Sequence, residues 1–239
     1  MKEPTRSRLE RIITIALFVT LLFSIAFTIV RMINTPSDII GGEDVKAKSD
    51  YALMLLQCTL GLVVMALPSF IGRRLDLHIP SVMMIFYLLF LYAAIYLGEV
   101  RSFYYAIPHW DIILHCFSGF MLGCLSFSFI TLLNKWEKIP MTLSPVFVSL
   151  FAFCFTLSLG VFWEIYEFAF DGLLKLNMQK FMDANGVAMI GREALQDTME
   201  DLIVDGIGAF AASLAGYISL KYNKGWIEKF QIKRRKSAQ

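Results

Sequence analysis

Long apolar stretches alternate with short polar segments along this chain, and the pattern predicts helices that cross a membrane. A helix needs about 20 apolar residues to span the hydrocarbon core of a bilayer. Six stretches reach that length, near residues 12–30, 51–71, 79–98, 110–133, 143–170 and 201–220. We therefore expect an all-α, polytopic membrane protein with six transmembrane helices, forming a single integral membrane domain over residues 1–239.

The composition agrees with a membrane location, since 57% of the residues are hydrophobic and only 18% are charged. Basic residues precede the first span, as in a secretory signal peptide. That apolar stretch is longer than a signal peptide requires, and no small-residue cleavage site follows it. The first span is therefore expected to remain in the protein as a signal anchor.

The distribution of basic residues predicts the orientation. Six spans place both chain ends on one side, and 15 of the 22 Lys and Arg residues lie on that side, against 7 on the other. Because basic residues near span ends stay in the cytoplasm, both termini are expected there. The longer connections, residues 32–50 and the loop 172–200, are then outside. Loop 172–200 can act as a lid or be a plain surface loop, and the sequence does not distinguish these.

Acidic residues and one histidine interrupt the last three spans at helical spacing, which places each group on one helix face. Ionisable groups within membrane spans are costly and generally mark a functional site. Each group lies at the outer end of its span in the predicted topology, so the three groups are expected to converge. Their members are Asp111 and His115; Glu164, Glu167 and Asp171; and Asp197, Asp201 and Asp205.

Small residues share the face of these polar groups. Gly119 and Gly123 follow His115 at intervals of four, and Gly208, Ala212 and Gly216 follow Asp205 at intervals of three, four and four. Small residues allow membrane helices to approach closely. The acidic groups are therefore expected to point into the helix bundle and not toward lipid.

Several carboxylates cannot all remain ionised within a few ångströms of one another unless something compensates their charge. A bound divalent cation is one solution, and oxygen-rich sites with an imidazole suit Mg, Mn, Fe, Zn or Ca. The expected metal ligands are His115, Glu164, Asp201, Asp205 and Asp197, with Glu167 as a catalytic base or ligand and Asp111 either orienting His115 or binding the metal.

Two other interpretations of the acidic groups stay open. They can form a structural cluster that shares protons or pairs with basic residues, of which Arg101 and Arg192 are the nearest in sequence. They can also be solvated span ends. This is the expectation for Asp171, Glu200 and Asp197, although Asp197 is also one of the expected ligands.

The order DxxxH, ExxE, a glycine-bearing loop and DxxxD before a Gly/Ala-rich helix resembles the YjdF-like family of bacterial inner-membrane proteins, over about residues 110–216. The resemblance implies a multi-pass protein of the bacterial cytoplasmic membrane and a shared polar signature, without a particular reaction. The matching positions are Asp111, His115, Glu164, Glu167, Asp197 and Asp201. Phe168 departs from the Trp or Leu that other members tend to carry there.

The sequence leaves three functions open. One is a metal-dependent hydrolase acting at the outer face on a lipid or lipid-linked substrate. Another is a proton or divalent-cation transporter, although the cytoplasmic halves of the last three spans lack charged residues. The third is a non-catalytic accessory protein. No nucleotide-binding or serine-hydrolase motif is present, and nothing supports nucleic-acid binding. The four cysteines show no metal-ligand spacing and are assigned no role.

Overall fold

The structure is a computed structural model that describes residues 7–36, 46, 48–136, 142–183 and 187–234. Long helices form the six membrane spans. They are α1 (Arg8–Asn34), α2 (Lys48–Arg74), α3 (Ser81–Leu91) continued by the π-helix η1 (Tyr92–Val100), α5 (Trp110–Trp136), α6 (Pro145–Leu174) and α7 (Glu193–Lys221). The predicted all-α, multi-pass fold is confirmed for the described residues.

Short elements connect or follow these helices. They are the helix α4 (Phe103–Ala106), the 3-10 helix η2 (Ile227–Phe230) and two strands, β1 (Leu77–His78) and β2 (Lys233–Arg234). The strands pair antiparallel, with Leu77 opposite Arg234. This pairing joins the α2–α3 turn to the C-terminal segment.

Most helix ends extend beyond the apolar stretches from which they were predicted, although α3 and α6 each begin two residues later than expected. The largest difference is at α7, which begins at Glu193, eight residues before the predicted start of the span at 201. The polar residues in this extra segment end an apolar window but do not end a helix, because Glu, Gln and Leu are good helix formers. The connection between α6 and α7 is therefore 175–192, shorter than the predicted loop 172–200.

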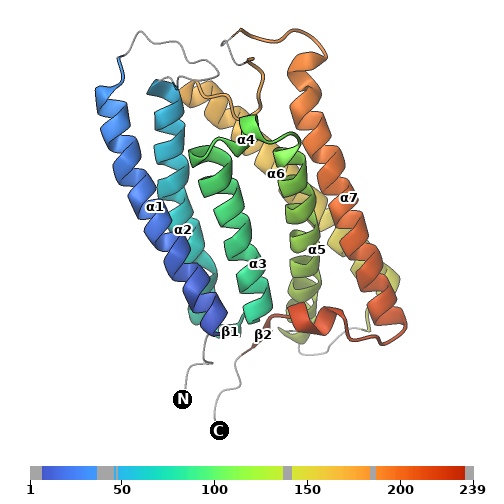
Figure 1. Ribbon diagram of the computed structural model, residues 1–239. Helices are drawn as coiled ribbons and strands as arrows, with labels where there is room; N and C mark the ends of the chain where they lie inside the picture. The colour runs from blue at the N-terminus through green and yellow to red at the C-terminus, as the bar shows by residue number, and fades with distance from the viewer. Residues whose placement is uncertain (1–6, 37–45, 47, 137–141, 184–186, 235–239) are drawn as a thin grey trace.

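The bundle has two parts that meet where α3 packs against α5 (Figure 1). In the first part, α1, α2 and α3 enclose a cluster of buried apolar residues that includes Leu21, Cys58 and Leu88. In the second part, α5, α6 and α7 pack against one another, and the most extensive contact is between α5 and α7. The acidic groups all belong to this second part.

Different elements lie at the two ends of the helix bundle. The first turn of α1 and the β1–β2 pair lie at one end, and α4 lies at the other, beside the start of α5 (Figure 1). The starts of α5 and α7 and the end of α6 share the α4 end. Large apolar side chains such as Phe162, Ile203 and Phe210 are more than half exposed on the outer surface of this three-helix unit, as expected for a surface that faces lipid.

Close helix contact at glycine positions aligns α5 with α7. A Cβ atom at Gly119 would lie 2.7 Å from the backbone oxygen of Asp205, and one at Gly208 would lie 2.5 Å from the backbone oxygen of Cys116. Only glycine allows the backbones to approach this closely. The predicted small-residue face is therefore the face on which α5 meets α7.

Candidate functional site

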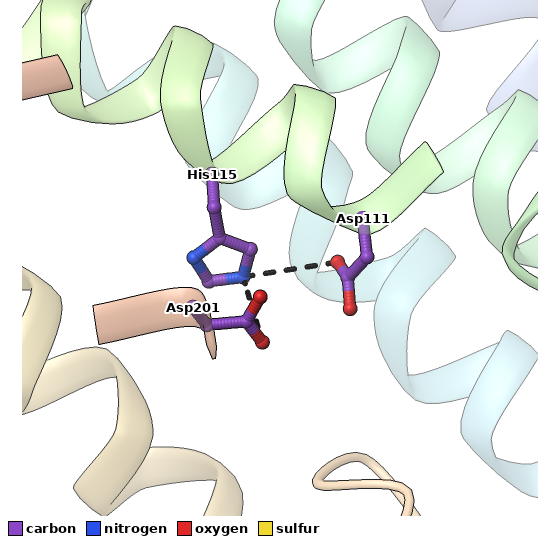
Figure 2. Close-up of side chains that lie close together, drawn as sticks. All are labelled: Asp111, His115 and Asp201. Atoms are coloured by element: carbon purple, nitrogen blue, oxygen red, sulfur yellow. Dashed lines mark ion pairs between the residues drawn. The ribbon is translucent and has the colours of Figure 1, made fainter. Parts of the chain in front are cut away.

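His115 lies at the centre of the polar cluster between α5 and α7. Its Nε2 atom is 3.7 Å from Asp111 Oδ1, one helical turn earlier on α5, and 3.6 Å from Asp201 Oδ2 on α7. The Asp111 and His115 side chains project from α5 toward Asp201 (Figure 2). One ligand atom from each of the three residues lies within 4.8 Å of the others, so together they can hold a metal ion.

Asp205 faces the opposite side of the imidazole ring. Its Oδ1 atom is 3.5 Å from His115 Nδ1 and also lies 3.4 Å from the hydroxyl of Ser118. A carboxylate beside the second ring nitrogen fixes the orientation of a metal-binding histidine. Asp205 therefore lies beside the second ring nitrogen, although His115 Nδ1 has no hydrogen-bond partner among the described residues. Asp111 and Asp201 both face Nε2, the nitrogen on which an ion would bind.

Helix α6 contributes two buried carboxylates. Glu164 is 5% exposed, and neither of its carboxylate oxygens has a hydrogen-bond partner among the described residues. Gln179 and Thr198 lie beside it, but Gln179 Nε2 donates its hydrogen bond to Thr198 Oγ1 at 2.9 Å. Glu167 is 8% exposed and accepts a hydrogen bond of 2.9 Å from Trp163 Nε1.

The cluster has a cationic partner that the sequence analysis did not assign. Lys180, in the α6–α7 connection, forms ion pairs with Asp111 Oδ2 and with Asp197 Oδ1, the second at 2.8 Å. Burial disfavours the charged ammonium group, but the carboxylates of Asp111 and Asp197 outweigh it and raise the pKa of Lys180. Arg101 and Arg192, the expected partners, are exposed.

Side-chain hydrogen bonds hold the backbone on both sides of Lys180 in place. The Asp171 carboxylate accepts hydrogen bonds from the backbone N–H groups of Met178, at 2.8 Å, and Gln179, at 3.0 Å. Asn177 accepts one from the N–H group of Met182 at 2.9 Å. The expectation that Asp171 is only solvated is wrong: it is 7% exposed, because the returning chain covers it and supplies two donors.

Tyr104 of α4 forms a wall of the site next to Lys180. The ammonium nitrogen lies 5.9 Å from the centre of its ring. Burial, and then the charge of Asp111, raise the pKa of Tyr104 well above its usual value, so the phenol stays neutral. Tyr104 of α4 and the connection that carries Lys180 therefore border the site at the α4 end of the bundle.

The predicted site residues do not all belong to one group of ligands. Asp111, His115 and Asp201 form the three-residue group, Asp205 lies behind the histidine, and Glu164 and Glu167 approach from α6. Asp197 lies outside this group and pairs with Lys180, so it is neither a member of that group nor simply solvated. No sequence signal distinguishes Lys180 from Lys175, the other lysine of the same connection.

Six long apolar helices, three of which carry the clustered ionisable groups, define a multi-pass integral membrane protein. The chain belongs to the family described as predicted membrane protein (DUF2238), whose members it matches over residues 13–222. An uncharacterised protein of Thermotoga maritima is 31% identical over 123 residues, which are 51% of this chain and 54% of that protein. The chain thus matches about half the length of this relative, and no solved structure matches it.

Proposed function

We propose that this protein binds a divalent metal ion through Asp111, His115 and Asp201 and uses it to hydrolyse a lipid or lipid-linked substrate at the outer face of a bacterial cytoplasmic membrane. The observation that carries the metal proposal is the spacing around His115 Nε2. The distances of 3.6 and 3.7 Å to two carboxylate oxygens are too long for hydrogen bonds. They resemble the separation of roughly 3.4 Å between two ligands that surround one tetrahedral ion at zinc-ligand distances.

The unpartnered Glu164 carboxylate supports the same proposal independently. A buried carboxylate without a hydrogen bond is costly, and a cation removes that cost. Six carboxylates gather here, from Asp111, Glu164, Glu167, Asp197, Asp201 and Asp205, while Lys180 and a protonated His115 supply at most two positive charges among the described residues. A divalent ion would offset much of this excess, with Glu164 as its further ligand.

The proposal that the protein catalyses hydrolysis rests on the residues near the candidate metal site. A bound divalent metal acidifies water and polarises the scissile group. In this proposal Glu167, which accepts a hydrogen bond from Trp163, would take the proton of the attacking water and return it to the leaving oxygen, so that water adds across the cleaved bond. The site lies at helix ends, where the headgroups of lipids are within reach.

Metal analysis of the purified protein tests this proposal. We expect about one divalent metal ion per chain in the wild type, and loss of that ion in Asp201→Ala. Glu193→Ala, an exposed acid at the start of the same helix, should retain it. Wild-type protein without metal would refute the proposal.

Hydrolysis requires a second measurement. The metal-loaded protein should release product from a lipid extract, and Glu167→Gln should bind the metal normally yet lose this activity. Metal uptake into proteoliposomes without any released product would instead indicate transport.

A further inference from the structure

The geometry points to Lys180 as the second cationic group of a phosphate-binding site, in which the ammonium and the metal ion together hold a phosphate group of the substrate. This inference rests on the proposed metal site and specifies the substrate class as a phosphate-bearing one.

The two carboxylate oxygens of Asp111 point to different groups. Oδ1 faces His115 Nε2 at 3.7 Å, where an ion would bind, and Oδ2 pairs with the Lys180 ammonium. Asp111 can therefore ligate a metal through one oxygen while it keeps Lys180 on the other. A metal ion and the ammonium would then be neighbours joined by a single carboxylate.

Two adjacent cations suit a phosphate group. Its oxygens are distributed over several directions, and sites for phosphate commonly combine a metal ion with a lysine or arginine. Without the ion, six carboxylates would repel an anion, so phosphate binding is expected only in the metal-loaded protein. With the ion, the Lys180 ammonium, which pairs with Asp111 and Asp197, is a second positive group beside it.

The position of Lys180 is fixed more firmly than that of an ordinary surface lysine. Its backbone has a φ of 46°, in the left-handed region that is costly for a residue with a side chain. The Asp171 carboxylate accepts hydrogen bonds from the two preceding backbone N–H groups, and the Asn177 side chain accepts one from the N–H group of Met182. These hydrogen bonds hold the backbone that directs the Lys180 ammonium toward Asp111 and Asp197.

The depth of the site fits a phosphate at the membrane surface. Helix α5 has 27 residues and is about 40 Å long, close to the full thickness of a bilayer with its headgroups. Asp111 is the second residue of this helix and therefore lies at headgroup level. A phosphate on a lipid can reach this position without leaving the membrane, and a free phosphate can reach it from solution.

Calorimetry on protein in phosphatidylcholine nanodiscs tests the inference, with Mn²⁺ and inorganic phosphate as probes. We expect wild-type protein to bind phosphate only after it has bound Mn²⁺. Lys180→Met should weaken phosphate binding at least tenfold while Mn²⁺ affinity stays equal or rises, because a neighbouring positive charge has been removed. A misfolded variant would lose both, so this opposite response identifies a folded protein.

Two further variants complete the design. Lys175→Met, an exposed lysine on the same connection, should bind both probes as the wild type does. Lys180→Arg should keep measurable phosphate binding, because it keeps the charge. Normal Mn²⁺ and phosphate binding by Lys180→Met would overturn the inference and leave the metal site intact. No Mn²⁺ binding by the wild type would overturn both.

The source of the phosphate is resolved by adding phosphatidic acid to the nanodiscs. If a lipid phosphate is the natural ligand, phosphatidic acid should weaken the binding of inorganic phosphate to metal-loaded wild type. If a free phosphate is the ligand, binding should not change.

Discussion

Gly160 of α6 leaves the space that the carboxylate of Asp205 on α7 occupies. A Cβ atom at this position would lie 2.5 Å from Asp205 Oδ2. On the other side, Gly119 of α5 meets the backbone of the same residue, where a Cβ would lie 2.7 Å from the carbonyl oxygen. Two glycines from two helices thus fix Asp205, and Asp205 in turn lies against His115. The contacts that pack α5, α6 and α7 together therefore also set the position of Asp205 beside His115.

Gly119→Ala is expected to destabilise the protein by about 1–3 kcal/mol, because the methyl group meets backbone that cannot move without separating α5 from α7. Gly172→Ala is the matched control, since a Cβ there meets nothing within 4 Å and alanine favours the helix. The measurement is the apparent melting temperature in detergent. Equal melting temperatures for both variants would show that α5 and α7 do not approach as closely as described.

The number of spans could be predicted from the sequence because the bilayer imposes a length of about 20 apolar residues on each. The same argument failed at the start of α7, where Glu193 and its neighbours are helical but polar. Hydropathy detects the part of a helix that lies in lipid, whereas the helix itself ends where its hydrogen bonding ends.

Helical spacing also predicted which acids share a face, and the three groups do converge in space. Spacing could not identify the partner of each acid. Lys180 lies 69 positions from Asp111 and 17 from Asp197, and no local pattern encodes that contact. Likewise, Asp171 ends the acidic face of α6, but its role depends on a chain segment that folds back over it.

Labelling of single cysteines tests the predicted orientation. In a variant without the four native cysteines, Ile190→Cys should react with a membrane-impermeant maleimide in intact cells, since Ile190 is 86% exposed in the α6–α7 connection. Lys229→Cys, in η2 at the opposite end, should react only after the cells are broken. The reverse result would place the acidic site in the cytoplasm.

Replacement of Glu164 should separate stability from metal binding. Glu164→Met removes a buried carboxylate without hydrogen bonds, so the metal-free protein should be more stable by about 1–3 kcal/mol. With saturating Mn²⁺ the order should reverse, because binding stabilises only the protein that holds the ion. Melting temperatures in EDTA and in Mn²⁺ measure this, with Glu193→Gln as an exposed control. A loss of stability in EDTA would mean that Glu164 has a partner that it keeps without metal.

Asp171→Ala is expected to loosen the connection between α6 and α7 while the helices stay intact. The substitution leaves the backbone N–H groups of Met178 and Gln179 without their acceptor, at a cost of about 1–3 kcal/mol for each hydrogen bond to the charged group. Hydrogen exchange should accelerate in peptides from 175–192 and remain unchanged in the middle of α6.

Asp171→Asn is the informative comparison, because its amide oxygen can still accept one of the two hydrogen bonds. Exchange in this variant should lie between that of the wild type and that of Asp171→Ala. Because the same backbone carries Lys180, Asp171→Ala should also weaken phosphate binding to the Mn²⁺-loaded protein. Faster exchange with unchanged phosphate affinity would mean that Lys180 reaches Asp111 without the support of Asp171.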